Sequence, residues 1–340
     1  MNPDSGIKSQ MIFDCKLWSV NITPTLYRHL PRRHCSAPSA VTIGNFDGVH
    51  LGHQAILERV HQYATKHGLL PTVMTFTPHP RAYFAQLTRK SDLAPAQIST
   101  LRDKTARLAA CGMQQIVILR FNQALAQMGA EAFIRTLLVK GLNTRWLLVG
   151  EDFRFGHRRA GDIALLRRLG AELGFTVDTL QDVKESSGRR ISSSSLRSVL
   201  AAGQVAQAAH LLGAPPRISG HVIHGRKLGR RIGFPTLNLR VPEPSAMRHG
   251  IYVVRVLGLG PRPLAGVASL GIRPTVTKDG PLLLETHILD ASPDAYGTLV
   301  SVELLHFLRD EETFPDLASL GAAIQSDVQG ARTYFASHGL

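Results

Sequence analysis

Short apolar runs alternate with helical patterns through the first half of this chain. The runs are rich in β-branched residues, as is typical of strands buried in a parallel sheet, and they cover Ala40–Ile43, Thr72–Phe76, Gln115–Leu119, Arg145–Val149 and Phe175–Leu180. One intervening helix is predicted over Gln54–His67, with an apolar face formed by Ile56, Val60, Tyr63 and Ala64. This alternation predicts a doubly wound α/β sheet, whose ligands bind at the carboxyl ends of its strands.

The pattern changes in the second half. Ser192–Leu212 predicts two short helices separated at Gly203, and Pro215-Pro216 marks a boundary after them. Beyond it, strand-like runs bounded by Gly/Pro turns cover Gly250–Leu257, Leu264–Leu270, Leu282–Leu289 and Thr298–Phe307, before a helical pattern over Phe314–Ser337. These runs predict an antiparallel β-barrel capped by a C-terminal helix. We therefore expect a lead-in over residues 1–39, an α/β domain over 40–190, a helical connector over 191–215 and a barrel domain over 216–340.

Length, charge and cysteine content narrow the class of protein. The 340 residues suit two domains, and a 44% hydrophobic composition argues against a disordered or fibrous chain. The net charge of +14 predicts an anionic partner, which is a nucleic acid, an acidic membrane or a phosphorylated small molecule. Cys15, Cys35 and Cys111 form no CxxC pair, which suits a reducing compartment. No secretory pattern and no run of about 18 apolar residues is present, so we expect a cytoplasmic protein without a membrane partner.

A glycine-rich segment, Gly44–His53 (GNFDGVHLGH), joins the first predicted strand to the first predicted helix. Glycines let a phosphate approach the backbone closely, and a helix N-terminus offers unpaired N–H groups and a positive dipole end. His50 and His53 lie three residues apart, so both side chains reach one ligand and donate hydrogen bonds as charge builds at phosphorus. The alternative is a plain loop with two exposed histidines. The chain has neither a GxxxxGK loop nor a GxGxxG fingerprint in a βαβ unit.

With this motif the chain resembles the HxGH nucleotidyltransferase superfamily, and in particular the Rossmann-like N-terminal half of bacterial bifunctional riboflavin kinase/FAD synthetases. Three further segments carry the resemblance: Thr75–Phe84 (TFTPHPRAYF), Val149–Asp162 (VGEDFRFGHRRAGD) and Ile191–Arg197 (ISSSSLR). The resemblance implies that His50 and His53 stabilise the transition state. It implies nucleotide binding by Gly44, Phe46, Asp47, Gly48, Ser193, Ser194 and Arg197, and flavin binding by Asp152 and Phe153.

The chain departs from the family pattern at three positions. Ser194 replaces a threonine and keeps the hydroxyl, Ser195 replaces a frequent arginine, and Arg158 replaces a usual glycine. We interpret these departures as tuning, because the HxGH motif and Arg197 are intact. Two plainer interpretations stay open from the residues alone: the serine run is also suited to a helix N-cap, and Thr75–Phe84 to a strand end with a proline turn.

A second glycine-rich, basic segment spans residues 220–239, GHVIHGRKLGRRIGFPTLNL, with glycines at 220, 225, 229 and 233. Glycines permit a tight loop, and the cations attract a polyphosphate. Thr236 and Asn238 project to the same side of a predicted strand, where a hydroxyl and an amide oxygen are suitable ligands for a hard cation. A β-hairpin with a basic tip fits the same residues equally well.

The GRxxGFPTxNL pattern resembles the riboflavin kinase motif, and the resemblance extends through Gly250–Tyr252, Gly271–Pro274, Leu284–Asp290 and Val302–Phe314. It implies that Thr236 and Asn238 bind Mg²⁺ and ATP phosphates, and that Glu285 is the base for the riboflavin 5′-hydroxyl. It implies further nucleotide contacts by Gly225, Gly229, Gly233 and Pro235, and flavin contacts by Tyr252 and Arg309. Surface pairing of Arg309 with Asp310–Glu312 is equally consistent with the residues.

Together the two resemblances imply a two-step enzyme that acts on riboflavin, FMN and ATP. The barrel transfers the γ-phosphoryl group of ATP to riboflavin, and the α/β domain lets the FMN phosphate attack the α-phosphate of a second ATP. A different HxGH transferase, adenylylating phosphopantetheine or a nicotinate nucleotide, would have no use for the second domain. A nucleic-acid-binding protein should interleave aromatics with its basic residues, and aromatics are only 6% here. A non-catalytic flavin-binding protein would not need two sets of catalytic residues.

Overall fold

The N-terminal half of the computed structural model is a parallel sheet of six strands covered by helices, and the model describes residues 23–30, 37–181, 190–225, 229, 232–272 and 280–339. The sheet has the order β1-β4-β3-β2-β5-β6, and every pair is parallel. Its strands are β1 (Thr25–Tyr27), β2 (Ser39–Ile43), β3 (Leu70–Thr77), β4 (Gln115–Arg120), β5 (Thr144–Gly150) and β6 (Thr176–Leu180). The doubly wound fold predicted from the apolar runs is confirmed.

Seven helical segments accompany this sheet. They are α1 (Leu51–His67), α2 (Pro80–Leu87), α3 (Leu101–Ala110), α4 (Gln123–Ala126), α5 (Ala130–Phe133), a π-helix (Ile134–Gly141) and α6 (Ile163–Leu173), and short 3₁₀ turns lie at Ser91–Leu93 and His157–Arg159. Buried side chains on both faces of the sheet form two clusters, one around Val41 and one around Trp146. Burial on both faces explains why the strands read as continuous apolar runs.

The chain order reverses next to β2. From β2 the chain moves to β3 and β4 on one side, whereas β5 and β6 lie on the other. The carboxyl ends of β2 and β5 therefore flank the crevice where ligands bind in such sheets. Gly44 follows β2 directly, and Gly150 ends β5. The first glycine-rich motif thus lies at this crevice.

The C-terminal half is an antiparallel barrel. Its strands are β7 (Arg217–His221), β8 (Thr236–Arg240), β9 (Gly250–Leu257), β10 (Leu264–Ile272), β11 (Leu282–Ile288) and β12 (Leu299–Arg309), in the order β7-β12-β9-β10-β11-β8. The Ile223 amide donates to the Asn238 carbonyl at 2.9 Å and links the two edges of the sheet. The predicted barrel is confirmed, and the helix α10 (Leu317–His338) covers one flank of it.

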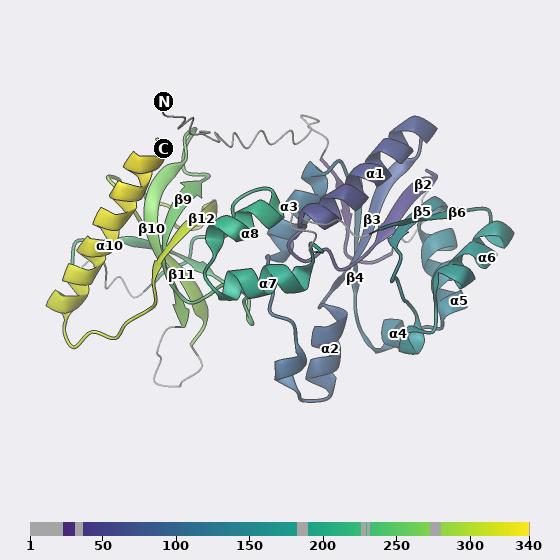
Figure 1. Ribbon diagram of the computed structural model, residues 1–340, viewed down its shortest axis with the longest axis horizontal. Coiled ribbons are helices and arrows are strands. Elements are labelled where there is room, and N and C mark those ends of the chain that lie inside the picture. The colour runs from purple at the N-terminus through teal and green to yellow at the C-terminus, as the bar shows by residue number, and fades with distance from the viewer. Residues whose placement is uncertain are drawn as a thin grey trace, which may run out of the picture.

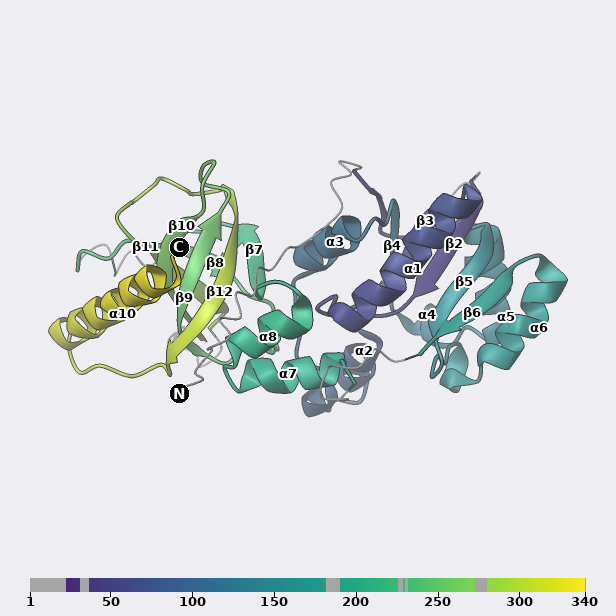
Figure 2. The ribbon, with the colours of Figure 1, turned by 45° about the horizontal axis from the view of Figure 1, so that its top comes forward.

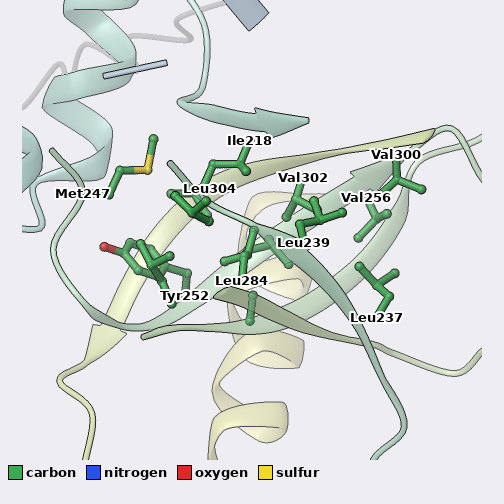
Figure 3. Close-up of a cluster of buried hydrophobic side chains, with 14 of the residues drawn as sticks. Ile218, Leu237, Leu239, Met247, Tyr252, Val256, Leu284, Val300, Val302 and Leu304 are labelled. Atoms are coloured by element: carbon green, nitrogen blue, oxygen red, sulfur yellow. The ribbon is translucent and has the colours of Figure 1, made fainter. Parts of the chain in front are cut away.

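Side chains alternate between the interior and the outer face of the barrel. One set, which includes Tyr252, Leu284 and Leu239, fills the interior core drawn in Figure 3. The other set, which includes Ile251 and Val267, packs against α10. This period of two determines which residues of each motif are available to a ligand outside the barrel.

Helices α7 (Ser193–Ala201) and α8 (Val205–Leu212) lie between the two halves, as Figures 1 and 2 show. Their buried side chains form one cluster with Ile98 from the first half and Ala246 from the second. Gln97 forms two backbone hydrogen bonds across the interface: its amide donates to the Pro244 carbonyl at 2.6 Å, and its carbonyl accepts from the Ala246 amide at 2.8 Å. The two halves are therefore joined by main-chain pairing as well as by the connector.

A buried carboxylate adds a second joint. Asp103 on α3 is 3% exposed and accepts hydrogen bonds from the Ser219 hydroxyl at 2.5 Å and the Ser219 amide at 3.0 Å. The Ser219 hydroxyl also lies 2.7 Å from that of Ser301. Arg107, one turn further along α3, donates to the Pro215 carbonyl at 3.0 Å. Helix α3 is thus attached to the first strand of the barrel by polar contacts.

One of the expected boundaries differs from the structure. Thr25–Tyr27 lies within the expected lead-in, yet it is the parallel edge strand beside β4, so the domain begins before residue 40. This strand has only three residues and is partly exposed, so it has no clear apolar pattern.

Residues 1–22 and 31–36 of the lead-in lie outside the described residues, as do parts of the basic loop (226–228, 230 and 231) and residues 273 and 274. In the described chain, no helix combines the length and the apolar character needed to span a membrane.

Candidate active sites

The first candidate site is a cavity of about 250 Å³ at the reversal point of the parallel sheet. Its lining includes Gly44, Phe46, His50 and His53 from the first motif, together with Asp152, Phe153 and Ser193. Residues separated by almost 150 positions in the chain therefore meet at one crevice, as the motifs predicted. Ile43, Gly52, Ile56, Gly150, Leu180, Gln181, Arg190, Ile191 and Ser192 complete the wall.

The loop before α1 has a constrained backbone. Phe46 and Val49 adopt positive φ angles of 48° and 44°, a conformation that is costly for residues other than glycine. The ring of Phe46 is 2% exposed and lies 5.0 Å from that of His53, so its burial helps to hold this conformation. A Cβ on Gly48 would meet Ile98 at 2.7 Å, and the φ of Gly48 is 82°. These contacts keep the loop close to the N-terminus of α1.

The two histidines are stacked and neutral. Their ring centroids lie 3.7 Å apart, and His50 is the N-cap of α1, its Nδ1 accepting from the His53 amide at 3.4 Å. Burial, together with the charges of Arg190 and Arg197, lowers the pKa of His50 to about 4. Burial, followed by the charges of His50 and Lys104, also lowers the pKa of His53. Because Nδ1 of His50 is an acceptor, its ring proton is carried on Nε2.

Arg197 reaches the first motif through Asp47. Its Nη2 lies 2.6 Å from the Asp47 carboxylate, and its Nε donates to the Ala96 carbonyl at 2.7 Å. The same carboxylate accepts from the Ile98 amide at 3.2 Å. Asp47 therefore orients Arg197, and neither residue is part of the cavity wall. Arg197 donates from Nη1 to none of the described residues, so this nitrogen is available to an anion.

The serine run begins α7. Ser192 is the N-cap and forms a capping box with Ser195, each side chain accepting from the other residue's amide at 3.1 Å. Ser193 lines the cavity and donates to the Asp47 carbonyl at 3.2 Å. Ser194 is exposed and is not part of the cavity wall. The departure from the family at Ser195 thus has a local role as part of the cap.

Geometry explains the departure at Arg158, and it adds one residue, Arg190, to the site. Arg158 has a φ of 52°, in the left-handed region where glycine is favoured, which accounts for the usual glycine at this position. Arg190 was not among the predicted site residues, yet it lines the cavity and lies 3.3 Å from the Asp152 carboxylate. The only sequence signal for Arg190 was its place directly before the Ile191–Arg197 motif.

The second candidate site is a cavity of about 280 Å³ between the outer face of the barrel and α10. Thr236 and Glu285 line it, and Glu285 pairs with Asn238 across β8 and β11. Directly opposite residues on neighbouring strands project to the same face, so the Asn238 side chain belongs to this face as well. Asn238 is 3% exposed. The remaining wall is formed by Gly229, Ile232, Phe234, Ile251, Val267, Ala268, Ser269, His287, Arg309, Glu311, Glu312, Phe314, Leu320, Ile324 and Asp327.

Gly229 lies where no side chain fits. A Cβ on it would lie 2.3 Å from the Phe234 carbonyl oxygen, and the Phe234 amide donates to the Gly229 carbonyl at 2.8 Å. Gly233 has a φ of 87°, which requires glycine at this turn. The Pro235 carbonyl accepts from Nδ1 of His287 at 2.9 Å and lines a neighbouring pocket. Gly225 lies in neither cavity wall.

Acidic groups surround Arg309 at the α10 side of this cavity. Its Nε and Nη2 donate to the Asp327 carboxylate at 2.8 and 2.7 Å, and Glu312 lies 3.9 Å away. These contacts raise the pKa of Arg309, and they combine the two interpretations of this residue: it faces the cavity and it forms ion pairs. Burial raises the pKa of Glu311, and the nearby charge of Glu285 contributes to this rise. The Ser269 hydroxyl donates to Glu311 at 3.1 Å.

The predicted flavin contact of Tyr252 is wrong. Its side chain is 1% exposed in the barrel interior, and its hydroxyl donates to the Arg248 carbonyl. Figure 3 shows Tyr252 among the interior core residues. In β9, only the alternate residue Ile251 reaches the cavity. The alternation of side chains along β9 would have distinguished the two from the sequence alone.

Comparisons with known proteins match both halves separately. The protein-family model for FAD synthetase matches residues 32–195, and the protein-family model for riboflavin kinase matches residues 212–335. The bifunctional riboflavin kinase/FMN adenylyltransferase of Escherichia coli (strain K12) is 44% identical over 87% of this chain and 92% of its own length. The protein of the same name from Pseudomonas fluorescens is 42% identical over 86% of this chain and 91% of its own length.

A solved structure covers nearly the whole fold. It is titled as a macrolide-efflux protein from Streptococcus pneumoniae, and it resembles this chain with a TM-score of 0.74 and 29% identity. The similarity spans 91% of this chain and 98% of that one. The arrangement of an α/β half followed by a barrel is therefore shared by a protein of known structure.

Proposed function

Because this chain belongs to the bifunctional riboflavin kinase/FMN adenylyltransferase family, we propose which of its residues carry the family's two reactions. The chain is a transferase: it phosphorylates riboflavin to FMN, and it adenylylates FMN to FAD. We assign the first reaction to the barrel with α10 and the second to the α/β half with α7. The observation that carries this assignment is that each half has its own cavity, lined by a different set of motif residues.

The adenylyl transfer takes place at the crevice of the parallel sheet. A phosphate oxygen of FMN attacks the α-phosphorus of ATP, the bond from that phosphorus to the bridging oxygen breaks, and pyrophosphate leaves. No covalent enzyme intermediate is needed, so the protein contributes alignment and charge stabilisation. The neutral His50 donates from Nε2, and the N-terminus of α1 adds its free amides. His53, Ser193 and Nη1 of Arg197 are the further phosphate donors.

The bases and flavin of this step occupy the rest of the crevice. We propose that Gly44 and Phe46, which line the cavity, shape the nucleotide site, and that Asp152 and Phe153 contact the flavin or the nucleotide. Gly48 lies outside the cavity wall and contributes through the backbone of the loop. Asp47 acts by holding Arg197. We assign a nucleotide contact to Ser194 only through its backbone, because its side chain is exposed outside the wall.

The riboflavin kinase reaction takes place on the outer face of the barrel. Glu285 accepts the proton of the riboflavin 5′-hydroxyl as its oxygen attacks the γ-phosphorus of ATP, and ADP leaves. Gly229 and Gly233 let the backbone approach the phosphates. We assign nucleotide contacts to Gly225 and Pro235 as well, because they belong to the same motif. Arg309, held by Asp327, borders the flavin end of the cavity.

ATP-dependent transferases of this kind use a divalent cation, and we propose that it is Mg²⁺. Thr236 and Asn238 fit such an ion, because they offer a hydroxyl and an amide oxygen on the same face as Glu285, and hard oxygen ligands suit Mg²⁺. When bound there, the cation neutralises part of the phosphate charge. No cluster of three or more His, Cys, Asp or Glu residues that would hold a different metal is found in the described residues.

A product assay tests both assignments in one protein. The full chain is incubated with riboflavin, ATP and Mg²⁺, and FMN and FAD are separated by chromatography. We expect Glu285→Gln to stop FMN formation while FMN supplied directly is still converted to FAD. We expect His50→Asn with His53→Asn to stop FAD formation while FMN accumulates. Loss of both activities in each variant would contradict separate sites.

A further inference from the structure

Lys104 lies beneath the first glycine-rich loop, and none of the motifs includes it. It is the fourth residue of α3, and its Nζ donates to the Asn45 carbonyl at 3.2 Å and to the Thr75 hydroxyl at 3.2 Å. The Thr75 hydroxyl donates in turn to the same Asn45 carbonyl at 3.0 Å. The ammonium group therefore connects α3, the end of β3 and the loop that precedes α1.

The ammonium has no direct carboxylate partner among the described residues. Burial lowers the pKa of Lys104, and the charge of Asp47 partly opposes this effect. The Asp47 oxygens, however, are hydrogen-bonded to Arg197 and to the Ile98 amide. A partly buried cation whose partners are only neutral oxygens is costly to keep, so a reason for its presence is needed.

The surroundings of Lys104 are positive. Its charge lowers the pKa of His53 on α1 and of His79 before α2, and Arg197 on α7 acts on both of those histidines in the same direction. Asp47 is the one negative group that counters Lys104 itself. Of these residues, His53 lines the crevice to which we assign phosphate binding, and an anion bound there would compensate the excess positive charge.

The loop that Lys104 contacts is the one with a costly backbone. Phe46, next to Asn45, has a positive φ of 48°. Such a conformation persists only where neighbouring contacts fix it. On one side of Phe46, the Asn45 carbonyl is held by Lys104 and Thr75. On the other side, Asp47 is held by Arg197 and Ile98.

We propose that Lys104 is a positioning residue for adenylyl transfer: its ammonium fixes the loop at Asn45 and supplies a positive charge behind His53. This inference rests on the proposed function of the crevice. The fixed loop presents the α1 N-terminus and Nε2 of His50 to the α-phosphate. The charge keeps His53 neutral and stabilises the negative charge that develops on the phosphates.

The test compares Lys104→Met with Lys104→Arg in the full chain. We expect Lys104→Met to lower kcat for FMN adenylylation by about 10- to 100-fold, as expected for a displaced or weakened electrostatic contact. Riboflavin phosphorylation in the same sample should stay at the wild-type rate, because its site lies in the other half. Arg102→Met is the matched control: this residue is an exposed cation on the same helix, and its loss should leave both rates unchanged.

The pH profile separates a charge role from a structural role. In the wild type, FAD formation should decline at alkaline pH as Lys104 loses its proton, below the ordinary pKa of a lysine. Lys104→Arg should keep its rate to higher pH, because a guanidinium stays charged. Identical alkaline profiles, a wild-type kcat in Lys104→Met, or an equal loss of both activities would each overturn the proposal. Absence of FAD formation by the wild type itself would instead refute the proposed function.

Discussion

His50 makes the stability of the N-terminal half depend on pH. Its imidazole is 5% exposed, stacks on His53 and has a pKa lowered to about 4. In the unfolded chain the same group has a pKa of about 6.5. Between these two values acid protonates the unfolded chain and not the folded one. The stability of the folded state therefore falls as the pH falls from 6.5 towards 4.

The size of this loss follows from the two pKa values. Each pH unit within the window corresponds to about 1.4 kcal/mol. At about pH 4.5, the loss through His50 alone is therefore about 2.5 kcal/mol relative to neutral pH. An asparagine does not titrate, so His50→Asn lacks this contribution. We expect the fall in stability between pH 7 and pH 4.5 to be smaller in the variant by about 2.5 kcal/mol.

Trp146 provides a local probe for this measurement. It is 1% exposed in the core of the parallel sheet, stacks on Tyr63 at 4.0 Å and donates from Nε1 to Asp178 at 3.0 Å. The chain has one other tryptophan, Trp18, so Trp18→Phe leaves Trp146 as the reporter. Urea unfolding followed by this fluorescence at both pH values gives the free energies for each variant.

Val60→Ala on α1, the helix that His50 caps, is the matched control. Val60 is fully buried and does not titrate, so its loss should lower stability by a similar amount at both pH values. If His50→Asn showed the same pH dependence as the wild type, the imidazole would not be held neutral by burial. The reasoning about the neutral donor at Nε2 would then fail as well.

Two further predictions concern the barrel and the interface. Gly229→Ala should displace the Phe234 carbonyl, because the new Cβ would lie 2.3 Å from that oxygen, and FMN formation should fall by about 100-fold while FMN-to-FAD conversion persists. Gly260→Ala is the control: a Cβ there would meet no atom within 4 Å, so neither rate should change. Asp103→Ala removes a buried carboxylate that accepts two hydrogen bonds from Ser219 and one from Thr100, so the unfolding free energy should fall by about 3 kcal/mol in calorimetry. Asp103→Asn should lose less, and equal stability of all three proteins would contradict the role given to this joint.

Local patterns were sufficient to predict most strands of both sheets and the motif-bearing loops, but not β1 or β7. The buried strands read as apolar runs because both faces of the parallel sheet are covered, and His50 and His53 were found because their spacing lies within one helical turn. The short edge strand Thr25–Tyr27 was missed because its pairing with β4 depends on residues 90 positions away. No local pattern marks such a strand.

Residues that reach a site through tertiary packing were not predicted. Lys104 contacts the loop of the first site because α3 packs behind that loop, and Asp327 lines the second site because α10 folds back on the barrel. Tyr252 was assigned to the flavin because it belongs to a motif, although the alternation along β9 directs it inward. Motif membership indicates which strand forms a site, and the position along that strand decides which side chain faces it.

The segment of residues 96–98, centred on Gln97, forms hydrogen bonds with both catalytic halves. Ala96 accepts from Arg197, Ile98 donates to Asp47, and Gln97 itself pairs with Pro244 and Ala246 of the barrel half. Excising the barrel would strip two backbone groups of their partners next to the arginine of the crevice. The two halves are thus not interchangeable: a barrel taken from another protein must also form these hydrogen bonds with residues 96–98.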